Sequence, residues 1–236
     1  MSSLQRPPPA NHLIAALPRG DRQQLLKKCK HVELTYADVL CEPGARIRHV
    51  YFPTSGLISL LTPVDRHPSV EVGMVGHEGV AGIPLFLGAN TSSVRALVQG
   101  SGSALRITAA SFRNHAARST SLRRELNRYL YTFIVQVTQT AGCNSRHQLG
   151  PRLARWLLMT HDRMQSDQFY LTQDFLAHML SVQRAGVTKA ATLLQKKKLI
   201  SYKRGHITIL DRRGLERASC ACYRAVNKIC DALPRN

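Results

Sequence analysis

The sequence predicts an α+β protein in which a β-rich N-terminal half and a helical C-terminal half are joined by one long helix. Three observations support this fold class. Between residues 31 and 107, short runs rich in β-branched and aromatic residues alternate with turn residues. Between residues 122 and 141, apolar residues recur at helical spacing in a single stripe. Beyond residue 171, two short amphipathic helices precede a pair of short β-rich runs.

Composition and charge restrict the class of protein further. The 236 residues are 44% hydrophobic, which is too much for a disordered chain and enough for one large domain or two small ones. They include 33 Lys and Arg against 14 Asp and Glu, a net charge of +19, so a polyanionic partner is expected. The longest apolar stretch, near residues 79–89, contains Pro84 and is much shorter than the roughly 20 residues of a membrane-spanning helix.

The N-terminal end is predicted to be a disordered leader over residues 1–12, which contains the run Pro7–Pro9. This leader lacks the apolar core of a signal peptide, which favours a cytoplasmic protein with no membrane partner. Apolar residues over Asn11–Lys28 predict a short helix that is interrupted at Pro18–Gly20.

The segment from residue 13 to residue 118 is predicted to form an antiparallel β-roll of the jelly-roll kind. Its strand candidates are the seven runs Val32–Tyr36, Val39–Cys41, Val50–Pro53, Leu57–Leu61, Val70–Val75, Val94–Val98 and Ser103–Ile107. Turn residues at Glu42–Gly44, Thr54–Gly56 and Gly100–Gly102 separate several of these runs. Such regular spacing is typical of a sandwich or roll. Helical spacing resumes at Thr108.

Residues 119–146 are predicted to form one long helix. Six apolar residues at spacings of 4, 4, 3, 4 and 4 form its stripe: Leu122, Leu126, Leu130, Phe133, Val137 and Ala141. The stripe could cover the helix's own β-roll or the same helix of a second copy. A stripe of about six turns is longer than one small roll covers, which favours a dimerisation helix and hence a homodimer.

The last 90 residues are predicted to form a separate domain, residues 147–236, because Gly150–Pro151 disfavours continuation of the long helix. Leu153, Trp156 and Leu157 predict a short amphipathic helix beyond that boundary. This domain has 16 Lys and Arg against 6 Asp and Glu, a net charge of +10, whereas the preceding 146 residues have a net charge of +9. The denser positive charge places the polyanion-binding surface in the C-terminal domain.

Residues 171–210 show the most informative pattern. Thr172 is a candidate N-cap of a first helix, because its hydroxyl can accept a hydrogen bond from the first turn. Ser181–Gln183 breaks that helix, a second helix follows, and two short strands then flank the basic turn Lys203–Gly205. Helix, tight turn, helix and hairpin are the layout of a winged helix-turn-helix. The alternative is a solvated basic face on an ordinary pair of helices.

The winged helix-turn-helix predicts double-stranded DNA as the partner. Short polar and basic side chains at the start of the second helix can meet base edges in a major groove, and basic residues of the hairpin can neutralise phosphates. The predicted DNA-contacting residues are Thr172, Gln173, Gln183, Arg184, Ala185, Thr188, Lys189, Lys203, Arg204 and His206.

Three stretches resemble the Crp/Fnr family of bacterial transcription regulators: His49–Gly56, Arg152–Leu157 and, most specifically, residues 172–200. The resemblance extends from about residue 13 to residue 225. It implies a cyclic-nucleotide-binding-like sensor roll over residues 13–118, a dimerisation helix and a winged helix-turn-helix. It also implies a homodimer on a pseudo-palindromic operator, with RNA polymerase as a candidate further partner.

The resemblance extends to single residues of the second helix. Arg184 matches the arginine that commonly reads a guanine in this family, and Lys189 matches a second basic position. Ala185 stands where many members have an acidic base-contacting residue, which implies a different operator. Ser181 stands at the turn position that glycine usually holds, where a positive φ would strain a serine.

The predicted effector pocket corresponds to the family's phosphate-binding cassette and comprises Gly76, Glu78, Gly79, Asn90, Thr91, Ser92 and Ser93. Glu78 is offset by one residue, neutral Asn90 stands where a phosphate-binding arginine is expected, and Arg95 matches a different position. A cyclic phosphate would therefore lack its charged partner. The roll is expected to sense a signal other than cyclic AMP, its effector is unknown, and no cofactor is predicted.

The chain has six cysteines: Cys29, Cys41, Cys143, Cys220, Cys222 and Cys230. The first 28 residues contain none, so the N-terminal cysteine cluster of the family's oxygen-sensing members is missing. Cys220, Cys222 and Cys230 could supply three metal ligands, but no Cys-x-x-Cys pair occurs and no His stands at ligand spacing beside them. Reduced intracellular thiols without a metal site are therefore predicted, and a redox or metal role is the alternative.

Together these observations predict a sequence-specific DNA-binding regulator that is not an enzyme. The sequence has no Gly-rich phosphate loop, His-Glu-x-x-His motif, nucleophile elbow or plausible carboxylate pair. The alternative is a ligand-binding sensor whose winged domain binds other proteins. A negative or apolar recognition face would favour that alternative, whereas the predicted face is basic.

Overall fold

The structure is a computed structural model, and it describes residues 10–232. The N-terminal lobe contains α1 (His12–Ala15), α2 (Arg19–Leu26), β1 (Lys30–Leu34), β2 (Val39–Cys41), β3 (His49–Val64), β4 (His67–Val75), α3 (Ile83–Phe86), β5 (Arg95–Thr108) and α4 (Ala109–Arg118). The long helix α5 (Thr120–Arg146) follows. The C-terminal lobe contains α6 (Leu149–Met164), β6 (Gln168–Tyr170), α7 (Gln173–Leu180), α8 (Arg184–Lys196), β7 (Ile200–Lys203), β8 (His206–Ile209), α9 (Arg212–Ala218) and α10 (Cys222–Ala232).

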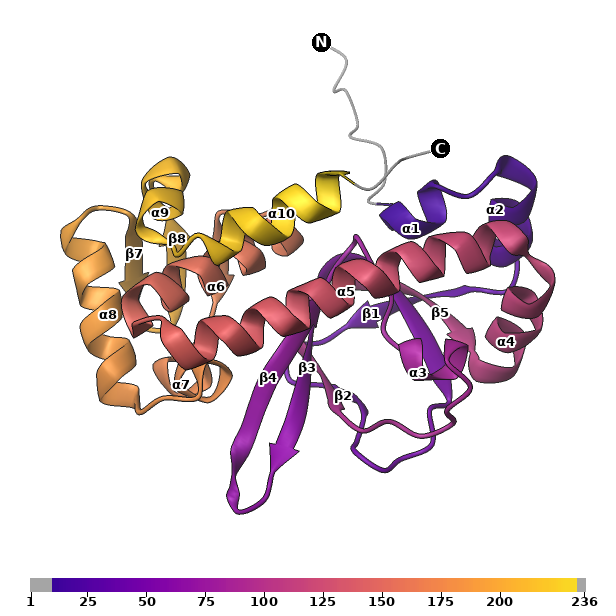
Figure 1. Cartoon of the computed structure of the whole chain (residues 1–236), viewed down its shortest axis with the longest axis horizontal. Coiled ribbons are helices and arrows are strands. Elements are labelled where there is room, and N and C mark those ends of the chain that lie inside the picture. The colour runs from indigo at the N-terminus through magenta and orange to yellow at the C-terminus, as the bar shows by residue number, and fades with distance from the viewer. Residues whose placement is uncertain (1–9, 233–236) are drawn as a thin grey trace, which may run out of the picture.

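The two lobes lie at opposite ends of the molecule, and α5 extends along both (Figure 1). The N-terminal lobe is built on an antiparallel sheet with the strand order β1-β5-β3-β4, and β2 also pairs with β5. The C-terminal lobe holds an antiparallel sheet with the order β6-β8-β7. This arrangement confirms the predicted α+β fold class. Within residues 10–232, no helix is both long and apolar enough to cross a lipid bilayer.

The predicted leader extends too far along the chain. Residues 1–9 lie outside the described part, but Asn11 is only 2% exposed. Its Oδ1 accepts a hydrogen bond from the backbone N–H of Ile14 at 3.2 Å and so caps α1. Its Nδ2 donates to the carbonyl oxygens of Pro53 and Gly79 at 2.9 and 2.7 Å. The prediction that the disordered leader extends to residue 12 is therefore wrong, because Asn11 attaches this part of the chain to the β-roll.

The strands β3 and β5 are longer than predicted, because two expected turns lie inside them. The runs on either side of Thr54–Gly56 form one strand, and so do the runs on either side of Gly100–Gly102. The two backbones approach closely here: a Cβ atom on Gly56 would lie 2.6 Å from the carbonyl oxygen of Gly100. These glycines therefore permit close strand pairing with local register shifts instead of ending the strands.

The C-terminal hydrophobic core extends into the β-roll. It includes the buried Trp156 of α6 together with Leu57 and Met74 of the roll. Beside this contact, the indole Nε1 of Trp156 donates to the buried carboxyl group of Glu71 at 2.7 Å. The hydroxyl of Ser59 donates to the other oxygen of the same carboxyl at 2.6 Å. Apolar packing and a buried polar contact thus join the two lobes.

The helix α5 does not present the whole predicted stripe to a partner. Leu122 and Leu126 are 0% and 2% exposed and pack in the roll's own core, and Phe133 packs against that core. The prediction that these three residues face a second copy is therefore wrong. Its physical reason is that a mean spacing near 3.8 residues exceeds the helical 3.6, so the stripe rotates by roughly 100° around the helix over its length.

The C-terminal two-thirds of α5 has a different apolar face. Tyr131 and Ile134 are 50% and 49% exposed, far more than large apolar side chains in a core. With Leu130, Val137 and Ala141, Ile134 forms a row at spacings of 4, 3 and 4 residues. Such spacing is typical of a coiled-coil seam. Of the predicted stripe, Leu130 and Val137 are half-buried and Ala141 is exposed.

The junction between α5 and α6 lies directly after residue 146, where the sequence predicts the end of the long helix. His147 and Gln148 have extended backbone conformations and separate the two helices. Gly150 and Pro151 lie inside the first turn of α6, where proline is tolerated because that turn's N–H groups have no intrahelical acceptor. The same proline that was expected to end a helix therefore helps to begin one.

Candidate nucleic-acid interface

The helix pair α7–α8 is positioned by a cap and a tight turn. The hydroxyl of Thr172 accepts a hydrogen bond from the backbone N–H of Phe175 at 3.1 Å, as expected of an N-cap. The helix α7 ends at Ser181, whose φ of +52° reverses the chain direction. Leu180 and Val187 are buried in the common core and hold the two helices together.

One face of α8 is buried and the opposite face is exposed. The buried residues are Val187, Ala190, Ala191 and Leu194. The exposed residues at the N-terminal end are Gln183, Arg184, Ala185, Thr188 and Lys189. The structure therefore places all five predicted DNA-contacting residues of the second helix on one solvent-accessible surface, which we call the α8 face.

Internal contacts orient parts of the α8 face. The hydroxyl of Thr188 donates to the side-chain oxygen of Gln173 at 2.7 Å, which joins α8 to α7. The guanidinium of Arg184 lies 3.5 Å from the carboxylate of Asp174, and both side chains are more than 60% exposed. Exposed ion pairs of this kind contribute little to stability, so Arg184 can exchange Asp174 for another acceptor at small cost.

The predicted hairpin is present as β7 and β8, and its turn has a specific conformation. Lys203 pairs with His206, and the two residues between them, Arg204 and Gly205, have φ values of +50° and +82°. Two positive φ angles in a two-residue loop define the type I′ turn that suits a twisted hairpin. A Cβ atom on Gly205 would lie 2.6 Å from the ring of Tyr170.

The hairpin's basic side chains point into solvent. Lys203, Arg204 and His206 are exposed, and the ring of His206 lies 5.2 Å from that of Tyr170 on β6. The strand β6 pairs with β8 and completes a three-stranded wing. The sequence did not predict β6, because three residues are too few to show a strand periodicity.

The strained residue Ser181 supports a first testable prediction. Replacing Ser181 by Gly is expected to raise the free energy of unfolding by about 0.4–1 kcal/mol, because glycine adopts positive φ without the clash of a Cβ atom. Urea unfolding of the full-length chain measures the change. Ser181→Ala is the matched control, since it removes the hydroxyl and keeps the strain, and it is expected to give no gain. A gain with alanine equal to that with glycine would contradict the explanation.

The predicted effector residues do not form one pocket. Glu78 accepts a hydrogen bond from Nε of Arg163 at 2.8 Å, and the side-chain oxygen of Asn90 accepts one from Arg113. A Cβ atom on Gly79 would collide with the ring of Tyr129. Glu78, Asn90 and Gly79 therefore contact other residues of the chain at these positions. Of the seven predicted positions, only Ser92 and Ser93 line the large cavity of the roll.

The cavity itself has a volume of about 600 Å³ and lies between the β-roll and α5. Its lining is predominantly apolar and includes Tyr51, Leu60, Val72, Val80, Ile83, Leu130, Phe133, Ile134 and Val137. Among the residues that the structure describes, no Lys, Arg, Asp or Glu lines it. The sequence analysis did not predict the cavity, because its lining residues come from segments that are far apart in the sequence and share only their apolar character.

The pKa values of the two titratable rings of the cavity wall are each shifted in the direction that favours the neutral form. Burial, with the neighbouring cations Arg106 and Arg48, lowers the pKa of His49 below its ordinary range. Burial raises the pKa of Tyr51 above its ordinary range. The cavity thus combines an apolar wall with a few neutral hydrogen-bonding groups, which is typical of small-molecule sites.

These geometries define a winged helix-turn-helix domain that a long helix connects to a β-roll. Residues 151–218 match the family model of the Crp-like helix-turn-helix domain. The chain therefore carries a Crp-like helix-turn-helix domain and has the fold of the Crp/Fnr transcriptional regulators, which confirms the resemblance seen in the sequence.

Solved structures show the same fold over most of the chain. FixK2 from Bradyrhizobium japonicum has a TM-score of 0.69 at 12% identity, with 82% of this chain and 98% of that chain covered. A Crp/Fnr-family transcriptional regulator from Thermus thermophilus has a TM-score of 0.66 at 20% identity, with 80% and 98% covered. The c-di-GMP-responsive global regulator CLP of Xanthomonas campestris has a TM-score of 0.64 at 17% identity, with 81% and 99% covered. No curated protein matches the chain in sequence.

Proposed function

We propose that the chain is a homodimeric, sequence-specific DNA-binding transcription regulator. The observation that carries the proposal is the α8 face, where Gln183, Arg184, Thr188 and Lys189 project from the start of the helix that follows a tight turn. Side chains at this end of the second helix of a helix-turn-helix contact base edges. The exposed wing residues Lys203 and Arg204 add two charges for phosphate contacts.

The proposed dimer uses the exposed face of α5. The row of Leu130, Ile134, Val137 and Ala141 forms the seam with the same row of a second copy. A two-fold axis between the helices places two α8 faces in successive major grooves, about 34 Å apart, on a pseudo-palindromic operator. RNA polymerase is a candidate partner of the DNA-bound dimer.

The proposed effector is a neutral, mostly apolar small molecule that binds in the cavity. The cavity has no cationic side chain for a cyclic phosphate among the described residues, and an unpaired phosphate is costly to bury. Leu130, Ile134 and Val137 line the cavity and also belong to the seam. A ligand that binds the two dimer geometries unequally would therefore change the angle between the two DNA-binding domains.

The experiment that tests this function is the selection of bound duplexes from a random pool at ~150 mM salt, with and without apolar small molecules. Enrichment of a pseudo-palindromic site supports the proposal. A chain that enriches no site under any condition, while it binds proteins through the winged domain, would favour the alternative of a sensor that mediates protein contacts.

A second prediction concerns Arg184. Arg184→Ala is expected to cost about 1–3 kcal/mol of affinity for the selected operator and to relax the base preference at one position per half-site. Binding titrations against the operator and against random DNA measure the difference. Arg118→Ala removes an exposed arginine of α4 outside the interface and is the matched control. Equal losses on both kinds of DNA would show that Arg184 contacts phosphate instead of a base.

A third prediction concerns the wing. Lys203→Gln and Arg204→Asn each remove one charge, and Asn tolerates the positive φ at position 204. Each variant is expected to weaken binding to all sequences alike and to reduce the slope of log affinity against log salt by about 1 per half-site. Titrations at several salt concentrations measure the slope. An unchanged slope would place the wing away from the DNA backbone.

A further inference from the structure

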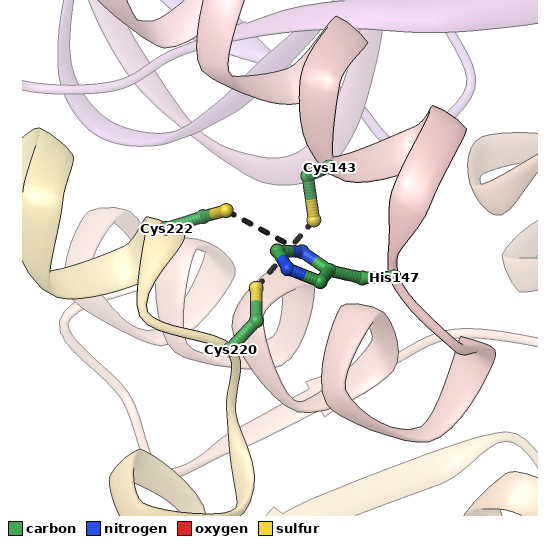
Figure 2. Close-up of side chains that lie close together, drawn as sticks. All are labelled: Cys143, His147, Cys220 and Cys222. Carbon is green, nitrogen blue, oxygen red and sulfur yellow. Dashed lines mark hydrogen bonds between the residues drawn. The ribbon is translucent and has the colours of Figure 1, made fainter.

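Four side chains with metal-binding donors converge where α5 ends (Figure 2). Cys143 lies in the last turn of α5, and His147 follows four residues later at its end. Cys222 is the first residue of α10, and Cys220 lies two residues before it, in the link from α9. Their donor atoms all lie within 4.8 Å of one another. The sequence did not predict this cluster, because 77 residues separate Cys143 from Cys220.

Two of the six separations between the donor atoms match those around one tetrahedral ion, and all six are within 4.8 Å. Sγ of Cys143 lies 3.5 Å from Sγ of Cys220, and Sγ of Cys222 lies 3.5 Å from Nδ1 of His147. Donors bound at the Zn–S and Zn–N lengths of about 2.3 and 2.0 Å in a tetrahedron lie roughly 3.5–3.8 Å apart. A disulfide would require a sulfur separation of about 2.05 Å. A cluster of several iron atoms would hold its ligands further apart, because different irons bind different sulfurs.

Three of the four side chains are buried, and His147 is exposed. Cys143, Cys220 and Cys222 are at most 9% exposed and form a cluster of their own, apart from the hydrophobic cores. The amide Nε2 of Gln139 donates to Sγ of Cys222 at 3.0 Å, a contact that orients a thiolate ligand.

Two arginines, the half-buried Arg152 and the buried Arg155, add a second, independent observation. The side-chain Nε atoms of Arg152 and Arg155 are buried and have no hydrogen-bond partner among the described residues. Both guanidinium groups are within electrostatic range of Cys143. Three thiolates around one Zn²⁺ carry a net charge of −1, and a buried negative charge requires compensating cations. The two arginines supply that compensation.

We propose that Cys143, His147, Cys220 and Cys222 bind one Zn²⁺ ion as a structural site. Zinc is the metal that a tetrahedral set of three cysteines and one histidine favours. Because four protein donors complete the coordination, no position remains for a substrate or an activating water. This proposal differs from the sequence prediction, which assigned no metal ligands.

The site joins two segments on either side of the DNA-binding domain. Cys143 precedes the break between α5 and α6, His147 lies in it, and the two other cysteines follow the wing and α9. The helix α10 packs along α5 and against α6 (Figure 1). The ion would therefore fix the angle between α5 and the winged domain. This consequence for DNA binding rests on the proposed function, whereas the zinc site itself does not.

The test begins with the full-length chain purified under reducing conditions. Elemental analysis is expected to find about one zinc ion per chain. Replacement of zinc by Co²⁺ is expected to give the visible and near-ultraviolet absorption of tetrahedral cobalt with thiolate ligands. Cys222→Ser and His147→Ala are expected to reduce the metal content to about zero. His147→Cys preserves four donors and is expected to retain the ion, which separates ligation from a general loss of folding.

The matched control is the pair Cys29→Ser and Cys41→Ser, which removes two half-buried cysteines of the N-terminal lobe and is expected to leave the zinc content unchanged. Three outcomes overturn the proposal: reduced wild-type chain that binds neither zinc nor Co²⁺, a Cys143–Cys220 disulfide found by mass spectrometry in the native protein, or the visible absorption of an iron–sulfur cluster. DNA titrations run separately. Zinc-loaded chain that selects no DNA site would refute the proposed function and leave the metal site supported.

Discussion

Replacing Ile134 by Asp is expected to convert the chain from a dimer to a monomer and to lower its affinity for a two-half-site operator by more than 100-fold. Ile134 is 49% exposed in the single chain and lies in the middle of the proposed seam. Desolvating an unpaired carboxylate costs several kcal/mol. A two-fold axis brings both copies of the substitution into the same interface. Since each 1.4 kcal/mol is tenfold in an equilibrium constant, the loss exceeds two powers of ten.

Analytical ultracentrifugation gives the mass in solution, and titration with a palindromic duplex gives the affinity. The matched control is Val39→Asp, which places the same charge at a 43% exposed apolar position on β2 and is expected to leave the dimer intact. An Ile134→Asp chain that remains dimeric would show that another surface forms the interface.

Replacing Glu71 by Gln is expected to stabilise the chain at pH 8 far more than at pH 4. Burial raises the pKa of Glu71 to about 7, although hydrogen bonds from Ser59 and Trp156 and the charges of Arg163 and Arg155 act in the opposite direction. The folded chain therefore holds this carboxyl protonated up to about pH 7, whereas the unfolded chain ionises it near its ordinary value of 4.5. Wild-type stability consequently falls as the pH rises from 4.5 to 7.

The expected loss across this window is on the order of 3 kcal/mol. Glutamine keeps a similar shape and has no charge to bury, so the stability difference between Glu71→Gln and the wild type is expected to grow over the same pH range. Urea unfolding at pH 4, 6 and 8 measures it. Glu33→Gln, at an exposed position of β1, is the control for a change of charge at the surface. A constant difference at all three pH values would show that Glu71 does not titrate on unfolding.

The features that the sequence predicted depend on short-range signals. The cap at Thr172, the turn at Ser181 and the spacing of Val187 and Leu194 all act within a few residues. Each limits the local backbone to few conformations. For this reason the order α7, α8, β7 and β8, and the exposed side of α8, followed from the residues alone.

The features that the sequence did not predict depend on residues far apart in the chain. Gly56 and Gly100 mark a turn in isolation, and only their contact across β3 and β5 makes them part of a continuous sheet. Glu78 is one residue away from a ligand-binding position of the family, but its contact with Arg163, 85 residues away, places it outside the cavity wall. The apolar pattern also cannot show which side of α5 packs against the β-roll, because apolar residues lie on both its buried and its exposed sides.

The shared wall of the cavity and the seam has a thermodynamic consequence. Leu130, Ile134 and Val137 line the cavity and also belong to the proposed dimer seam. A ligand that tightens or loosens self-association must, by reciprocity, bind the associated and the dissociated chain with affinities that differ by the same factor. Its half-saturation point will then shift with protein concentration. The abundance of the chain in the cell would itself set the sensitivity of the response.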